Sequence, residues 1–178
     1  KSIPSGLKDL IQSNTLQKFK QQSQYETLDL TPLRGQTKPL VFSHWMSLIM
    51  LANDSFKLIL KSHYSFEDVC TFAKYNLPTA PTKENVHDLM REFCNLMGGV
   101  IKASFENHGI TAGLSLPLVT RGFDEVFFAP NASTDNMYDF FQLSHKDNKI
   151  IFSVHLEVID SGLLKKLASI KNIENTDE

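Results

Sequence analysis

The sequence has few cysteines, no long apolar run and no excess of charge of one sign. Its two cysteines, Cys70 and Cys94, do not form a Cys-x-x-Cys pair, which is typical of a reduced cytosolic protein. The longest apolar stretch, Trp45 to Ala52, is too short to span a bilayer, and the first residues lack the pattern of a signal peptide. The net charge is −2, without a Lys/Arg stripe. We therefore expect a cytoplasmic protein that binds neither nucleic acid nor membrane.

Common enzyme and metal-binding motifs are also missing. The chain has no Gly-x-Ser-x-Gly, P-loop or Gly-x-Gly-x-x-Gly pattern. Its six histidines show no spacing such as His-x-x-x-His, so we predict no metal site. Cys94 lies near the edge of an apolar stripe, and we interpret it as half-buried packing and not as a nucleophile.

What is present is the composition of one globular domain, with 42% hydrophobic and 21% charged residues. Residues 1–39 predict an N-terminal helix, capped by Ser5 and running from Gly6 to about Lys20, followed by an extended connection rich in proline. Residues 40–160 form the main domain. Residues 161–178 predict a final helix capped by Ser161, running from Gly162 to Ile170, and a frayed tail.

Within the main domain, alternation of apolar and polar residues indicates strands separated by turns. A first hairpin turns at Asn53-Asp54, and Ser65 caps a short helix that ends at about Tyr75. The predicted strands are residues 40–51, 56–62, 110–119, 125–129, 138–144 and 149–159. This order predicts an α+β sandwich, in which long helices cover a mixed or antiparallel sheet.

The most informative segment is a long helix from Glu84 to His108, capped by Thr82 and closed by Gly109. One third of its circumference is apolar and forms the core stripe, which comprises Val86, Leu89, Met90, Phe93, Met97, Val100 and Ile101. Glu92 and Asn95 stand one turn apart on the outward side. Gly98 and Gly99 follow, although a mid-helix glycine costs about 1 kcal/mol relative to alanine. We expect them to leave a flat surface that another molecule can approach.

Two stretches of this sequence carry a family pattern. Glu92-Phe93-Cys94-Asn95, the glycine four residues later and Lys102 resemble the Glu-x-x-Asn helix of the CheX/CheC/FliY phosphatases of bacterial chemotaxis. The stretch Gly113-Leu114-Ser115-Leu116-Pro117-Leu118-Val119, followed by Gly122, resembles the strand that comes after this helix in that family. The resemblance covers roughly residues 40 to 160 and implies a CheC-like fold. Only one Glu-x-x-Asn motif is present, which favours the CheX side of the family, whose members dimerise.

The resemblance implies that the protein hydrolyses the phosphoaspartate of a CheY-type response-regulator receiver domain. Asn95 would orient the attacking water, and Glu92 would contact the receiver, while Asp88, Gly98, Gly99 and Lys102 would complete the docking surface. The chain would need no cofactor of its own, because the receiver contributes a divalent metal, expected to be Mg²⁺. The expected partners are thus a phosphorylated CheY-like receiver and a second copy of the chain.

Two alternatives belong to other classes. The same exposed face would serve a non-catalytic CheX-like module that binds a receiver or another signalling protein without hydrolysis. More distantly, the chain could be a structural α+β domain, with Glu92 and Asn95 on an ordinary solvated helix face.

Overall fold

The structure, a computed structural model, describes residues 2–34, 43–122 and 134–170. Within these ranges the chain forms four helices and seven strands. In order they are α1 (Ser5–Ser23), β1 (Asp29–Pro32), β2 (Trp45–Asn53), β3 (Phe56–Tyr64), α2 (Phe66–Phe72), α3 (Lys83–Asn107), β4 (Gly113–Leu114), β5 (Leu118–Arg121), β6 (Asp135–His145), β7 (Asn148–Val158) and α4 (Leu163–Ala168).

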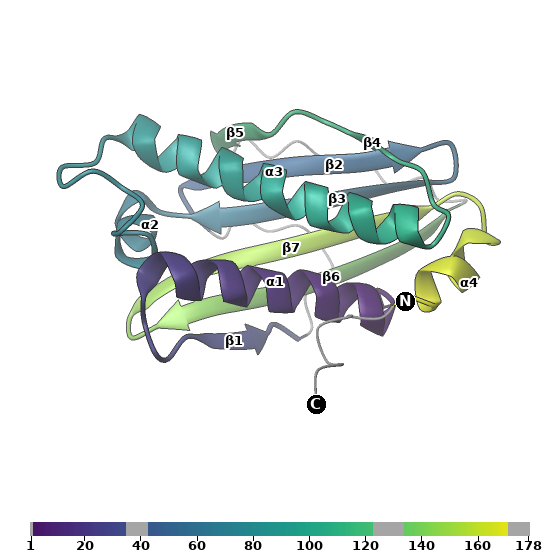
Figure 1. Cartoon of the computed structure of the whole chain (residues 1–178), viewed down its shortest axis with the longest axis horizontal. Helices are drawn as coiled ribbons and strands as arrows, with labels where there is room; N and C mark the ends of the chain where they lie inside the picture. The colour runs from purple at the N-terminus through teal and green to yellow at the C-terminus, as the bar shows by residue number, and fades with distance from the viewer. Residues whose placement is uncertain (1, 35–42, 123–133, 171–178) are drawn as a thin grey trace.

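The seven strands form one sheet in the order β1-β6-β7-β3-β2-β4, with β5 also paired to β2. All these named strands pair antiparallel. Helices α1 and α3 lie side by side across one face of the sheet (Figure 1). The predicted α+β sandwich, with long helices on an antiparallel sheet, is confirmed.

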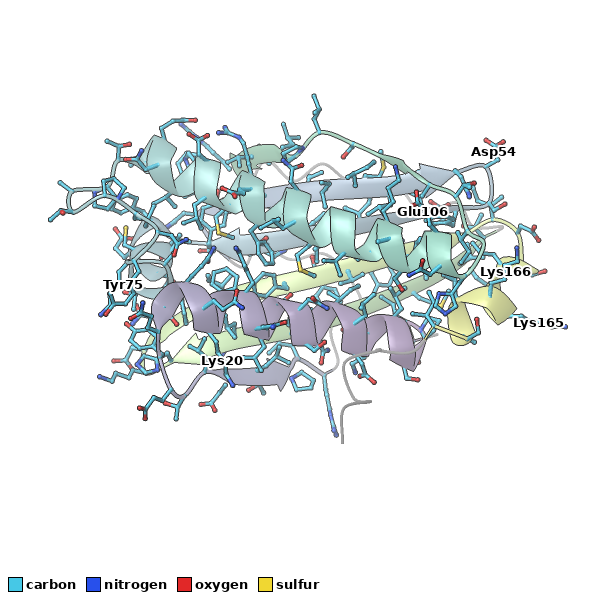
Figure 2. All side chains as sticks on the ribbon, in the orientation of Figure 1. Lys20, Asp54, Tyr75, Glu106, Lys165 and Lys166 are labelled. Carbon is cyan, nitrogen blue, oxygen red and sulfur yellow. The ribbon has the colours of Figure 1, made fainter. Side chains whose placement is uncertain are left out.

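The core lies between this helix layer and the sheet, where side chains fill the space (Figure 2). Three aromatic rings join its parts: Phe19 of α1 lies 5.2 Å from Phe93 of α3 and 6.0 Å from Phe152 of β7, measured between ring centroids. Phe93 and Phe152 are 5.5 Å apart. Such ring contacts add to the stabilisation that comes from area burial alone. The N-terminal helix therefore shares one core with the rest of the chain and holds α3 in place.

Two of the predicted helix caps are confirmed and two are wrong. Ser65 accepts a hydrogen bond from the backbone of Asp68 at 3.1 Å, and Thr82 forms a capping box at the start of α3. In contrast, the helix α1 already includes Ser5, because the Lys8 amide bonds to the carbonyl of Pro4. Near α4, the carboxylate of Asp160 accepts from the Gly162 amide at 2.9 Å, and Ser161 provides no side-chain cap. Helix α2 ends at Phe72, before the predicted Tyr75.

The single strand predicted for residues 110–119 is wrong, because β4 and β5 are separated by Ser115, Leu116 and Pro117. The predicted connection after α1 contains β1, which pairs with β6. The strand predicted at 125–129, the tail at 172–178 and the first residues of the strand predicted at 40–51 lie outside the described residues. Among the helices of the described ranges, none is both long and apolar enough to cross a membrane.

Candidate functional site

Helix α3 runs the length of the sheet beside the edge formed by β4 and β5 (Figure 1). Its start is fixed by the capping box, in which Thr82 Oγ1 accepts from the Asn85 amide at 3.2 Å and Asn85 Oδ1 accepts from the Thr82 amide at 2.9 Å. Its end is closed by Gly109 at φ +69°, a left-handed conformation that favours glycine. The apolar stripe predicted for this helix faces the core. The opposite face is therefore a straight ridge on a supported helix.

Glu92 and Asn95 both lie exposed on this ridge, one helical turn apart, as the sequence pattern predicted. Neither side chain has a hydrogen-bond or ion-pair partner within the described part of the chain. An ionised carboxylate accepts hydrogen bonds only, whereas a carboxamide both donates and accepts. The pair thus offers two different unused polar groups to an approaching molecule.

The charged residues around this pair are tied to one another along α3. Arg91 Nη1 lies 2.8 Å from Glu84 Oε1 and 2.6 Å from Asp88 Oδ1. Lys102 Nζ lies 3.9 Å from Glu106 Oε1, near the C-terminal end of the helix (Figure 2). Exposed ion pairs of this kind contribute less than about 1 kcal/mol each. Asp88 and Lys102, both predicted docking residues, are thus accessible but already paired in the free protein.

The two adjacent glycines lie in different environments. A Cβ added to Gly99 would meet nothing within 4 Å, so this position is an open gap in the ridge, as predicted. Gly98 is buried, and an added Cβ would lie 2.7 Å from Leu114 Cδ1 and 3.1 Å from Ile49 Cδ1. The prediction that Gly98 lies on the docking surface is therefore wrong. Its small size instead lets α3 approach the sheet beside β4.

Cys94, between the two ridge residues in sequence, points into the sheet. Its thiol donates to Ser47 Oγ at 3.3 Å, and Ser47 is in turn hydrogen-bonded to Ser62 at 3.0 Å. Burial raises the pKa of the Cys94 thiol to about 11. The residue is fully buried and not half-buried as predicted, because β2 lies directly beneath this turn. A protonated, enclosed thiol is no nucleophile, and it links the Glu92–Asn95 turn to β2.

The histidine of α3, His87, contacts two aromatic residues. His87 Nδ1 lies 3.0 Å from the Tyr64 hydroxyl, and its ring packs edge-on against Trp45 at 4.5 Å. Burial lowers the pKa of His87 and so favours the neutral ring. Within residues 2–34, 43–122 and 134–170, no group of three potential ligands is placed to hold a metal ion.

A shallow groove of about 230 Å³ lies between α3 and α1. One wall is polar and comes from α1, while the other is apolar and comes from α3. The sequence reasoning missed this groove, although the glutamine-rich stretch at the end of α1 forms part of it. The lining residues are Asn14, Gln17, Lys18, Gln21, Phe93, Leu96, Met97 and Val100.

No protein-family model matches the chain, and no curated protein matches it. Solved structures do. CheX from Vibrio vulnificus has a TM-score of 0.64 at 13% identity, over 85% of this chain and 99% of that protein. A CheC-like chemotactic protein from Shewanella oneidensis has a TM-score of 0.65 at 16% identity, over 87% and 97%. CheX in a complex with CheY, BeF₃ and Mg²⁺ from Borrelia burgdorferi has a TM-score of 0.60 at 15% identity, over 89% and 99%.

At these identities the similarity concerns the fold. It extends over nearly the whole length of each compared protein and over more than four fifths of this chain. The chain therefore has the fold of the CheX and CheC-like chemotaxis proteins.

Proposed function

We propose that the protein hydrolyses the phosphoaspartate of a CheY-type receiver domain, with Glu92 and Asn95 as the residues that enter the receiver's active site. The observation that carries this proposal is the exposed, unpartnered Glu92–Asn95 pair on the ridge of α3. The fold similarity to a CheX protein solved with CheY, BeF₃ and Mg²⁺ supports the choice of partner.

The shape of the site favours a protein substrate. Enzymes for small molecules enclose the substrate in a concave pocket that excludes water. Here the polar pair stands on a convex helix, so the concave part must come from the partner. In the proposed complex the ridge would close a hollow of the receiver that contains the acyl phosphate.

In the proposed reaction, water attacks the phosphorus in line and the aspartyl carboxylate leaves, so the products are the free receiver aspartate and inorganic phosphate. Such a transfer depends mostly on positioning and on charge neutralisation. The receiver's metal, expected to be Mg²⁺, would supply the charge neutralisation. The carboxamide of Asn95 accepts a hydrogen bond from the water and donates one to a phosphoryl oxygen. Glu92 would contact a cationic group of the receiver and fix the docked orientation.

The test is the decay of phosphorylated receiver domains from the same organism, with and without the protein. Asn95→Ala should lower the maximal rate by about 10²–10³-fold, which is typical for the loss of one positioned polar group in a transition state. Because Asn95 is exposed within α3, the variant should lose no stability and should gain at most about 0.7 kcal/mol from the higher helix propensity of alanine. Asn107→Ala, an exposed asparagine at the end of the same helix, is the matched control and should keep the parent rate.

Two outcomes would contradict the proposal. Full activity of Asn95→Ala would remove the catalytic role of that residue. An inactive parent that still binds receivers would instead favour the non-catalytic binding module.

A further inference from the structure

Three polar side chains are buried together beneath the turn of α3 that carries Asn95. Cys94 of α3, Ser47 of β2 and Ser62 of β3 are each 0% exposed. The Cys94 thiol donates to Ser47 Oγ at 3.3 Å, and Ser47 Oγ lies 3.0 Å from Ser62 Oγ. The two serines are direct neighbours across β2 and β3. A chain of two side-chain hydrogen bonds therefore runs from the helix into the sheet.

Apolar side chains surround this chain of hydrogen bonds. Ile49 and Leu60 are paired two residues further along the same strands, on the same face of the sheet, and both are 0% exposed. On α3, Met90 and Met97 are buried one turn to either side of Cys94. Polar groups in such a core gain little net stability from their hydrogen bonds, because their contacts with water are lost on folding. The stability of the core therefore gives no reason for polar groups at these three positions.

What the hydrogen bonds add is direction. Apolar contacts attract without a preferred angle, so an apolar stripe alone leaves a helix some freedom to turn and slide on a sheet. A hydrogen bond depends on distance and angle, and a buried polar pair fixes the register of packed helices in coiled coils. At the next turn, Gly98 has no side chain of its own to restrain the helix. The Cys94–Ser47 bond therefore restrains α3 around and along its axis, next to Asn95.

We propose that Cys94, Ser47 and Ser62 are positioning residues, which fix the rotation of α3 and so aim the Asn95 carboxamide at the phosphoryl group. This inference rests on the proposed function, since the aim of Asn95 matters to the rate only if its amide acts in the transition state. A displacement of about 1 Å in an active site can cost about 10²-fold in rate. Because the three side chains are buried and do not touch the receiver, their loss should lower kcat and change KM much less.

The test compares the double variant Ser47→Ala/Ser62→Ala with Thr15→Val. Thr15, the matched control, is also 0% exposed, and its Oγ1 donates to the Ile11 carbonyl at 2.8 Å within α1. Both changes remove buried hydroxyl groups, but only the double variant removes the restraint on α3. In dephosphorylation assays at varied receiver concentration, the double variant should have a kcat about 10-fold below that of the parent, with KM within about threefold. Thr15→Val should keep both parameters, and the urea midpoints of both variants should stay close to that of the parent.

Cys94 provides a second, independent pair of variants. Cys94→Ser keeps a donor for Ser47, so its kcat should stay within about threefold of the parent. Cys94→Ala removes the donor and should lower kcat about 10-fold. This pair also tests the inference if the double variant does not fold, and equal kcat values for Cys94→Ser and Cys94→Ala would overturn it.

The outcomes separate this inference from the proposed function. An active parent together with a double variant of parental kcat overturns the positioning role and leaves the phosphatase proposal intact. Equal losses of kcat in the double variant and in Thr15→Val assign the effect to a general loss of core packing and also overturn the inference. A parent that dephosphorylates no receiver overturns the proposed function, and the positioning role with it.

Discussion

Gly98 and Gly99 provide a test of how α3 sits on the sheet, because the two positions share one helix and differ only in what surrounds them. Replacing a glycine by alanine in a helix interior gains about 1 kcal/mol of helix propensity. At Gly99 nothing within 4 Å opposes the new methyl group, so Gly99→Ala should raise the free energy of unfolding by about that amount. For a chain of this size, that corresponds to an increase in Tm of roughly 2–4 °C.

At Gly98 the same gain is opposed by packing. The new methyl group would lie 2.7 Å from Leu114 Cδ1 and 3.1 Å from Ile49 Cδ1. Leu114 is 37% exposed and can turn aside, whereas Ile49 is fully buried and cannot. Overpacking of a core costs roughly 1–3 kcal/mol. We therefore expect Gly98→Ala to be no more stable than the parent, and about 1–3 kcal/mol less stable than Gly99→Ala.

Urea unfolding followed by circular dichroism and by the fluorescence of Trp45, the single tryptophan, measures both variants. A double-mutant cycle adds a sharper readout: Gly98→Ala should cost less when Leu114 is already Ala, because one of the two close contacts is gone. Equal stabilisation by Gly98→Ala and Gly99→Ala would refute the close approach of α3 to β4 and Ile49.

Two further predictions concern docking and pH. Glu92→Ala should raise the apparent KM for a phosphorylated receiver more than it lowers kcat, because the Glu92 contact would exist before the chemistry begins. Steady-state kinetics at varied receiver concentration measure the two parameters. A loss of kcat alone would mean that Glu92 acts only in the transition state and not in docking. Burial lowers the pKa of His63 to about 3, below its ordinary 6.5, so the folded state should bind this proton less readily than the unfolded chain. The contribution of the neutral His63 ring to the free energy of unfolding is therefore fully present above pH 6.5. It is lost as the pH drops toward 3, at up to about 1.4 kcal/mol per pH unit. Urea unfolding between pH 7 and 4.5 should show that the free energy of unfolding falls less for His63→Gln than for the parent. An equal fall in both proteins would remove His63 as the cause.

Local signals in the sequence predict much of α3 and its outward pair. The 3.6-residue spacing of apolar residues, Thr82 at one end and Gly109 at the other depend only on neighbours along the helix. The exposure of Glu92 and Asn95 follows from the same spacing. The turn at Asn53-Asp54, labelled at Asp54 in Figure 2, is equally local, and it brings β2 and β3 together.

The features that sequence reasoning missed depend on neighbours that are distant along the chain. Gly98 is buried because Leu114 and Ile49 cover it, and Cys94 is buried because Ser47 lies beneath it. The bulge at Leu116 arises from the register between β2 and the edge, which the alternation of residues 110–119 does not specify. A proline within a predicted strand was the available signal, since proline in a sheet is largely confined to edges and bulges.

These missed features explain how an exposed amide can be positioned precisely. The side chain of Asn95 has no partner within the described residues, so its location before docking depends on the backbone of α3 alone. That backbone is held on three sides: by the Cys94–Ser47 hydrogen bond beneath, by the Phe93–Phe19 contact toward α1, and by Leu114 packed over Gly98 toward the edge. Catalytic groups must be held within about half an ångström by their supporting residues. The ridge can therefore leave its polar groups unbonded, and available to a partner, because the helix that carries them is fixed from below.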